Sequence, residues 1–154
     1  MEALSLQTNI VFWLPGVPEP QGSKRGFYNP KLKRVMLVDV KHTQLRSWRQ
    51  EIIDAARNAY TGVPLDTALR IELLFGFDRP AGHYNAKGRL KPSAPHHMKT
   101  GKDIDKLERA VLDALKIAGM IRDDARVADL RGVKDYTDAL GFEMPGLRVQ
   151  VSER

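Results

Sequence analysis

The chain has 154 residues, of which 42% are hydrophobic and 29% charged, and its formal net charge is +6 at pH 7. Length and composition predict a single globular domain (residues 1–154) with one core. The absence of cysteine excludes a disulfide framework, a thiolate metal site and a thiol nucleophile. No apolar run approaches the roughly 20 residues of a membrane span, and no signal peptide is recognised at the start, so a cytoplasmic protein is expected.

The residue pattern predicts alternating strands and helices. Helices are expected where apolar residues recur every three or four positions, and strands where they alternate, as in Leu69, Ile71 and Leu73. In chain order the predicted elements are a strand over 10–14, a loop over 15–26, a hairpin or two short strands formed by 27–28 and 35–38, a helix over 43–60, a strand over 69–77, a long loop over 79–102, a helix over 106–118, a strand that includes 127–133, and a strand over 147–151.

This order predicts an α+β, or mixed α/β, domain in which two main helices pack on a small mixed sheet. Gly119 suits the position just after the second helix, where a left-handed backbone is common. The loop over 79–102 is longer than most connections in compact domains, and such loops are usually functional or disordered.

Positive charge is concentrated in two segments that precede an acidic one. Residues 24–34 carry five bases and no acid, residues 78–102 carry six bases and one acid, and residues 103–129 carry seven acids and five bases. A basic rim around an acidic centre would attract phosphates and concentrate a divalent cation. The alternative is a basic surface that serves only solubility.

Asp103 and Asp105 lie where an extended segment enters the second helix. Side chains two residues apart in an extended segment point to the same side, so the two carboxylates could share Mg²⁺ or Mn²⁺, which prefer oxygen ligands. Alternatively, Asp105 caps the helix, because Asp105 and Glu108 have capping-box spacing, and Asp103 is merely solvated.

A second acidic pair, Asp123-Asp124, follows the helix. Adjacent carboxylates repel each other and a cation would relieve the repulsion, although a polar turn is the simpler interpretation. A helix over 106–117 is about 18 Å long, and residues 118–123 reach at most roughly 20 Å. One chain can therefore bring the pairs together only if it doubles straight back along the helix; otherwise a partner subunit supplies the second pair.

Other residues narrow the chemistry. Arg109, one turn after Asp105, either stabilises negative charge on a phosphate or forms a plain surface pair with Asp105. The four histidines lack zinc-site spacing. No phosphate-binding loop or dinucleotide-binding glycine motif occurs, so no nucleotide cofactor is expected. The pattern as a whole favours metal-dependent cleavage of nucleic acid.

The run Asp103-x-Asp105-x-Leu107-x-Arg109-x-x-x-Asp113-Ala114-Leu115, followed by Gly119 and Asp123-Asp124-x-x-Val127, resembles the RusA family of Holliday junction resolvases. The opening strand followed by Gly16-x-Pro18-x-Pro20 and Lys24-Arg25 is also similar. The resemblance implies a homodimeric, Mg²⁺-dependent endodeoxyribonuclease of bacterial or phage origin. It would resolve four-way DNA junctions by paired symmetric nicks in recombination and repair.

The resemblance also implies residue roles. The catalytic acids of the family fall on Asp103, Asp105 and Asp124, with Asp123 as a helper, and its essential lysine falls on Arg109. Lys106 stands where the family usually has asparagine, and Arg126 where it has glutamine. Arginine keeps the positive charge of lysine but cannot act as a general acid.

The resulting hypothesis is that Asp103, Asp105 and Asp124 hold one or two Mg²⁺ ions, with Mn²⁺ as a possible substitute. The basic segments, with Lys24, Arg25, Lys99 and Lys102, would bind the branched DNA. Two alternatives remain open: a DNA-binding module without activity, and a nuclease for other branched substrates such as flaps or splayed arms.

Overall fold

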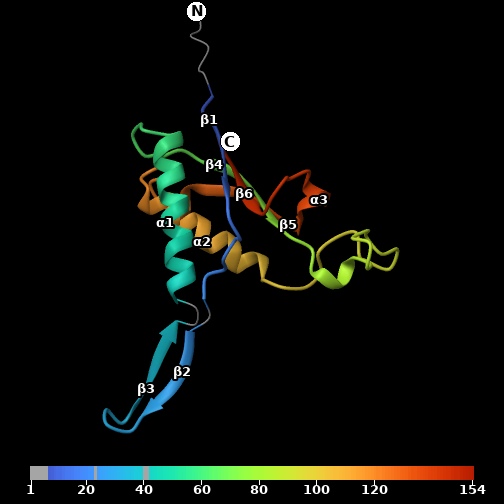
Figure 1. The fold of residues 1–154 in the computed structure, drawn as a ribbon. Helices are drawn as coiled ribbons and strands as arrows, with labels where there is room; N and C mark the ends of the chain where they lie inside the picture. The colour runs from blue at the N-terminus through green and yellow to red at the C-terminus, as the bar shows by residue number, and fades with distance from the viewer. Residues whose placement is uncertain (1–6, 23, 40–41) are drawn as a thin grey trace, which may run out of the picture.

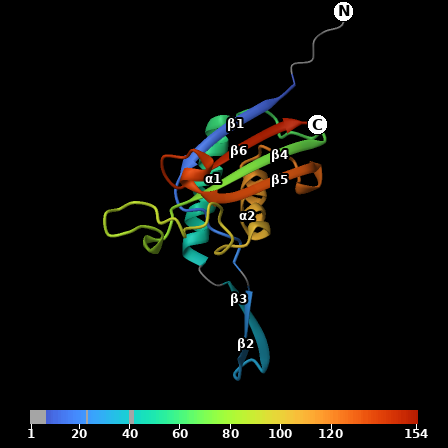
Figure 2. The ribbon, with the colours of Figure 1, turned by 90° about the vertical axis from the view of Figure 1, so that its right-hand side faces the viewer.

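The computed structural model describes residues 7–22, 24–39 and 42–154. Its main sheet, drawn nearly edge-on in Figure 1 and face-on in Figure 2, has four strands in the order β1-β6-β4-β5. The strands are β1 (Asn9–Pro15), β4 (Leu69–Phe77), β5 (Val127–Tyr136) and β6 (Gly146–Glu153). β6 pairs antiparallel with both β1 and β4, whereas β4 pairs parallel with β5, so the sheet is mixed.

Two helices, α1 (His42–Ala59) and α2 (Ile104–Ile117), cover one face of this sheet (Figure 2). Alternate residues of β4, such as Leu69, Ile71 and Leu73, are fully buried and belong to the same apolar cluster as residues of both helices. The predicted α+β fold with two main helices on a mixed sheet is therefore confirmed. None of the described helices is long and apolar enough to cross a membrane.

A second, two-stranded sheet consists of β2 (Lys24–Asn29) and β3 (Arg34–Asp39), which form an antiparallel hairpin. At its turn, Asn29 Oδ1 accepts hydrogen bonds from the amides of Lys31 and Leu32, and Lys33 has a left-handed backbone with φ of 50°. The hairpin projects past the start of α1, away from the main sheet (Figures 1 and 2). The predicted hairpin is confirmed, but the predicted loop over 15–26 is too long, because β2 begins at Lys24.

Both ends of α2 can be understood from the sequence. Its last turn closes with hydrogen bonds from the Gly119 amide to the Lys116 carbonyl and from the Met120 amide to the Leu115 carbonyl. This arrangement needs a left-handed residue, and Gly119 supplies it with φ of 79°. The helix begins at Ile104, two residues before the predicted start.

Two short elements were not expected from the pattern. The long loop over 79–102 contains a single turn of 3-10 helix, η1 (Ala81–His83), and a four-residue helix, α3 (Thr137–Leu140), follows β5. Neither is long enough to show a 3.6-residue repeat, which is the signal that reveals longer helices.

Candidate active site

Asp103 and Asp105 both lie at the first turn of α2 and expose their side chains. Asp103 occupies the N-cap with an extended backbone, yet its side chain accepts no capping hydrogen bond. It is 66% exposed and lies 3.5 Å from Lys106 Nζ. Asp105 follows inside the helix and is also exposed. The alternative in which Asp105 caps the helix is therefore wrong, because Asp103 holds that position. Both carboxylates face solvent at the positive end of the helix.

The start of α2 is fastened to the edge strand β5. Lys134 Nζ donates to the carbonyl oxygens of Lys102, 2.7 Å away, and Thr100, 3.2 Å away. These two residues lead directly into Asp103. Hydrogen bonds from an ammonium group are stronger than those between neutral groups, so Lys134 sets where the chain enters the helix.

The loop after β1 also forms hydrogen bonds with the start of α2 and with the residue just before Asp103. Lys102 Nζ donates to the Pro18 carbonyl at 2.8 Å and lies 3.3 Å from the Glu19 carboxylate. The Gln21 amide donates to the Lys106 carbonyl at 2.9 Å. Lys102, predicted to bind DNA, is only 25% exposed, so much of its side chain packs inside the protein.

Asp135, the residue after Lys134, holds the end of the long loop. Its buried carboxylate accepts hydrogen bonds from the amides of Met98 at 2.9 Å and Tyr136 at 2.8 Å, and it lies 2.7 Å from His97 Nδ1. Burial raises the pKa of Asp135, but these hydrogen bonds outweigh burial and leave the pKa below its ordinary value. Sequence analysis missed Asp135, because a single acid inside a strand gives no local signal.

Arg79, the first residue of the long loop, connects the later part of the loop to α3. Its guanidinium is almost completely buried, donates from Nε to Asp138 at 3.0 Å, and donates to the carbonyls of Pro95 and His96. It also lies over the ring of Tyr136, 4.3 Å from the ring centroid. Although Arg79 is one of the basic residues of the loop, its role is structural. Lys99, by contrast, is exposed to solvent.

Glu108 is a further acid near the start of α2. A methyl group added at Gly132 of β5 would meet its Oε1 at 2.6 Å, so Glu108 lies directly over a glycine of the edge strand. Burial, and secondarily the charge of Asp105, raises the pKa of Glu108. In the sequence, the only signal at Glu108 is its capping-box spacing from Asp105.

The second acidic pair lies after the opposite end of α2. Asp123 caps the short turn η2 (Asp124–Arg126), where it accepts a hydrogen bond from the Ala125 amide at 3.1 Å and lies 3.8 Å from Lys116 Nζ. The Ala125 hydrogen bond, followed by the charge of Lys116, lowers the pKa of Asp123. Asp124 is exposed, and no hydrogen bond or ion pair holds its side chain within the described part of the chain.

The two acidic pairs do not meet within one protomer. α2 has 14 residues, which corresponds to about 21 Å between its ends. Residues 118–123 do not double back along the helix, because Met120 is buried and Ile121 pairs with Leu65. The chain runs back past α2 only in β5, where Gly132 lies against Glu108. In residues 7–22, 24–39 and 42–154 no group of three acids or histidines could hold a metal ion. A three-carboxylate metal site therefore does not fit a single protomer.

The basic residues named from the sequence have different surroundings. Arg109 is exposed on α2 and forms no ion pair with Asp105, so the plain surface pair is absent among the described residues. Lys24 and Arg25 lie at the start of β2, and their side chains are outside the described set.

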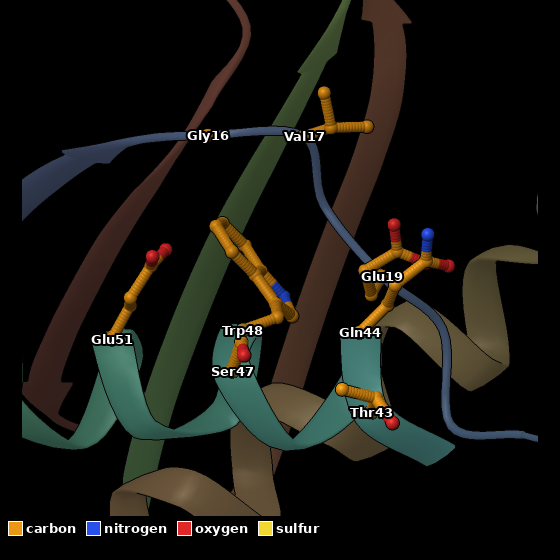
Figure 3. Close-up of a pocket in the computed structure, with 8 residues that line it drawn as sticks. All are labelled: Gly16, Val17, Glu19, Thr43, Gln44, Ser47, Trp48 and Glu51. Atoms are coloured by element: carbon orange, nitrogen blue, oxygen red, sulfur yellow. The ribbon is translucent and has the colours of Figure 1, made fainter. Parts of the chain in front are cut away.

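A hollow of about 310 Å³ lies between the loop after β1 and the first half of α1 (Figure 3). Its lining includes the carboxylates of Glu19 and Glu51 and the indole of Trp48. None of the described residues that line it is basic, so this hollow offers no positive charge to the DNA backbone.

Comparison with protein-family models matches residues 15–152 to Endodeoxyribonuclease RusA. A search of curated proteins found no match. The matched range contains α2 and both acidic pairs, as well as the basic segments on either side of α1. Nucleases of this family are typically metal-dependent. The chain belongs to the RusA family of endodeoxyribonucleases, which resolve Holliday junctions.

Proposed function

We propose that the protein cuts four-way DNA junctions as a homodimer whose two active sites are each built from both protomers. Asp103 and Asp105 of one protomer would face Asp124 of the other. One observation supports this arrangement: within a protomer, the two sets of exposed carboxylates lie at opposite ends of α2, a 14-residue helix about 21 Å long.

In a two-fold symmetric dimer, carboxylates at opposite ends of α2 can form two equivalent sites, one on each side of the axis. In such a dimer, the start of one α2 lies near the partner's η2, and the same contact recurs on the other side of the axis. A pair of symmetric sites suits a four-way junction, which needs one nick in each of two strands. Junction resolution by paired nicks then follows from the symmetry of the enzyme.

Within each site, the carboxylates would hold Mg²⁺, or Mn²⁺ in its place, which when bound would supply Lewis-acid chemistry for attack of water on the phosphodiester. Arg109, exposed one turn after Asp105, would bind the scissile phosphate and offset its charge. Lys134 would act without touching the DNA, because its Nζ binds the carbonyl of Lys102 and so holds the chain that carries Asp103.

The basic segments would bind the junction arms. Lys24 and Arg25 in the hairpin and Lys99 in the long loop would contact phosphates, and Lys102 would do so with the exposed part of its side chain. Phosphate contacts confer preference for shape rather than sequence. We expect the enzyme to act in the cytoplasm, on bacterial or phage DNA.

The test is a nicking assay on a synthetic four-way junction and on linear duplex, with and without Mg²⁺. We expect Mg²⁺-dependent nicks in opposed strands of the junction and little cutting of the duplex. Asp103→Asn should reduce nicking by about a hundredfold or more, since even residues that only orient metal ligands contribute ten- to a hundredfold, and it should leave junction binding intact. Asp113→Asn, on the same helix, is the matched control.

Nicking that survives Asp103→Asn would contradict the proposed site. A panel that adds flaps and splayed arms tests the substrate. Preferred cutting of one of these over the four-way junction would contradict junction resolution while leaving the nuclease assignment in place.

A further inference from the structure

The β2–β3 hairpin exposes an apolar surface to which the proposed function assigns no role. Tyr28 is 61% exposed, Val35 64% and Leu32 52%. Tyr28 and Val35 are directly opposite each other in the antiparallel register, so their side chains are neighbours on one face of the ribbon. Leu32 lies in the turn that joins the strands.

Positive charge surrounds this apolar surface. Lys31, Lys33 and Arg34 are exposed at the turn and the start of β3, and the segment 24–34 contains five bases without an acid. A two-stranded ribbon alone is at best marginally stable in water, and contiguous exposed apolar groups usually mark an interaction site. The charge of the segment selects a polyanionic partner.

The hairpin starts beside the catalytic helix. The Gln21 amide is bound to the carbonyl of Lys106 in the first turn of α2, and β2 begins three residues later at Lys24. Strands of six residues are about 20 Å long, so the tip of the hairpin reaches roughly that far from the carboxylates of Asp103 and Asp105. DNA bound at these carboxylates lies within reach of the hairpin.

We propose that the hairpin is a DNA-gripping arm, in which Tyr28 and Val35 pack against bases exposed at the branch point while Lys31, Lys33 and Arg34 bind the neighbouring phosphates. This inference rests on the proposed junction substrate. Apolar side chains gain nothing from phosphates, whereas bases that have lost their stacking neighbours offer flat apolar faces to an aromatic ring.

The charge distribution disfavours a second copy of the hairpin as the partner. Two hairpin tips packed on each other would bring together Lys31, Lys33 and Arg34 from both chains, with no acid in either segment to offset them. Like charges at such a contact repel each other. DNA supplies both the opposite charge and the apolar base surfaces.

The test measures binding without cleavage, in EDTA, to a four-way junction that carries 2-aminopurine at the branch point and to a linear duplex. Wild-type protein should change the 2-aminopurine fluorescence. Tyr28→Ala should weaken junction binding about tenfold, the order of one base-stacking contact, lose the fluorescence change, and leave duplex binding unaltered. Tyr28→Trp should restore both. Val63→Ser, at another exposed apolar side chain (81% exposed), is the matched control.

The basic residues make a separate prediction. Replacement of Lys31, Lys33 and Arg34 together by glutamine should weaken binding to junction and duplex alike. It should also make the dependence of log affinity on log salt concentration shallower by roughly 2 to 3, since each phosphate contact contributes about 0.9. Arg57→Gln, in the last turn of α1, is the charge control and should change little.

Either of two results would overturn the inference. One is junction affinity and 2-aminopurine fluorescence that stay at wild-type values in Tyr28→Ala. The other is conversion of the hairpin variants to monomers in light scattering, which would make the hairpin a subunit contact. These failures differ from failure of the proposed function, which would appear as wild-type protein that does not nick four-way junctions.

Discussion

Lys134, on the edge strand β5, donates from Nζ to the main-chain carbonyl of Lys102, 2.7 Å away, and Lys102 immediately precedes Asp103. A strand and the first turn of a helix are thereby joined by a charged donor. The position of the exposed carboxylates at the start of α2 consequently depends on a residue that need not touch the DNA.

Replacement of this donor should slow cleavage without weakening binding. In Lys134→Met the single-turnover rate of junction cleavage should fall about tenfold, because hydrogen bonds of charged groups contribute about 1.5–3 kcal/mol and 1.4 kcal/mol is tenfold. Junction affinity should stay unchanged, and Lys134→Arg should recover part of the rate. Lys87→Met, at an exposed lysine of the long loop, is the control. A wild-type cleavage rate in Lys134→Met would show that this contact does not position the site.

Asp135 should stabilise the fold in a pH-dependent way. The pKa of Asp135 is lower in the folded state than its ordinary value of 3.8. Its contribution to the free energy of unfolding is therefore present above pH 3.8 and is lost as the pH falls through the pKa of the folded state. Asp135→Asn should lower the free energy of unfolding by about 1–2 kcal/mol at pH 7, and less at pH 3. Asp129→Asn, at an exposed ion pair on the same strand, should change it by no more than about 0.5 kcal/mol. Urea unfolding of both variants at pH 7 and pH 3 is the measurement. A loss of stability in Asp135→Asn that is equal at the two pH values would contradict the prediction.

Most of the fold was predictable because its signals are local. The alternation of Leu69, Ile71 and Leu73 reports a strand with one buried face, and Gly119 marks the end of α2. β5 was harder to recognise, since Val127 and Leu130 are spaced by three residues. The register of β5 against β4 shifts between Leu69 and Arg70. Because of this shift, Val127 pairs with Leu69 and Leu130 with Ile71, two residues on the helix-covered side of β4.

The site was only partly predictable. The sequence identifies Asp103, Asp105, Asp123 and Asp124 by their spacing, but whether the pairs meet depends on the path of residues 118–123. That path follows from the burial of Met120 and Ile121 and from the pairing with Leu65, which is a long-range contact. The hydrogen bond from Lys102 to the Pro18 carbonyl likewise could not be predicted. In a sequence, a lysine that binds a main-chain carbonyl cannot be distinguished from one that binds a phosphate.

Glu108 should destabilise the fold at neutral pH. Its raised pKa means that the charged form is disfavoured in the folded protein, so its contribution to stability is greatest below the ordinary value of 4.5 and is lost as the pH rises through the folded value. Glu108→Gln should therefore stabilise the protein by about 0.5 kcal/mol at pH 7, a small gain because the side chain is partly exposed. The gain should vanish below about pH 4. Thermal unfolding at both pH values is the measurement, and a gain of equal size at both would contradict the assigned cause.

Arg109 should act through its charge. Arg109→Gln should slow cleavage about a hundredfold, as the loss of one group that stabilises a developing charge does, whereas Arg109→Lys should keep most of the rate. The measurement is single-turnover cleavage at saturating enzyme. Equal rates in Arg109→Gln and wild type would remove Arg109 from the site.

In the proposed dimer, each active site draws its carboxylates from two protomers. The most direct measurement uses heterodimers, purified through two different tags, of one Asp103→Asn protomer and one Asp124→Asn protomer. Each homodimer should be inactive, but the heterodimer has one complete site if Asp103 and Asp105 act with the partner's Asp124, so it should nick one strand of the junction in the presence of Mg²⁺. A heterodimer as inactive as both homodimers would contradict the shared site.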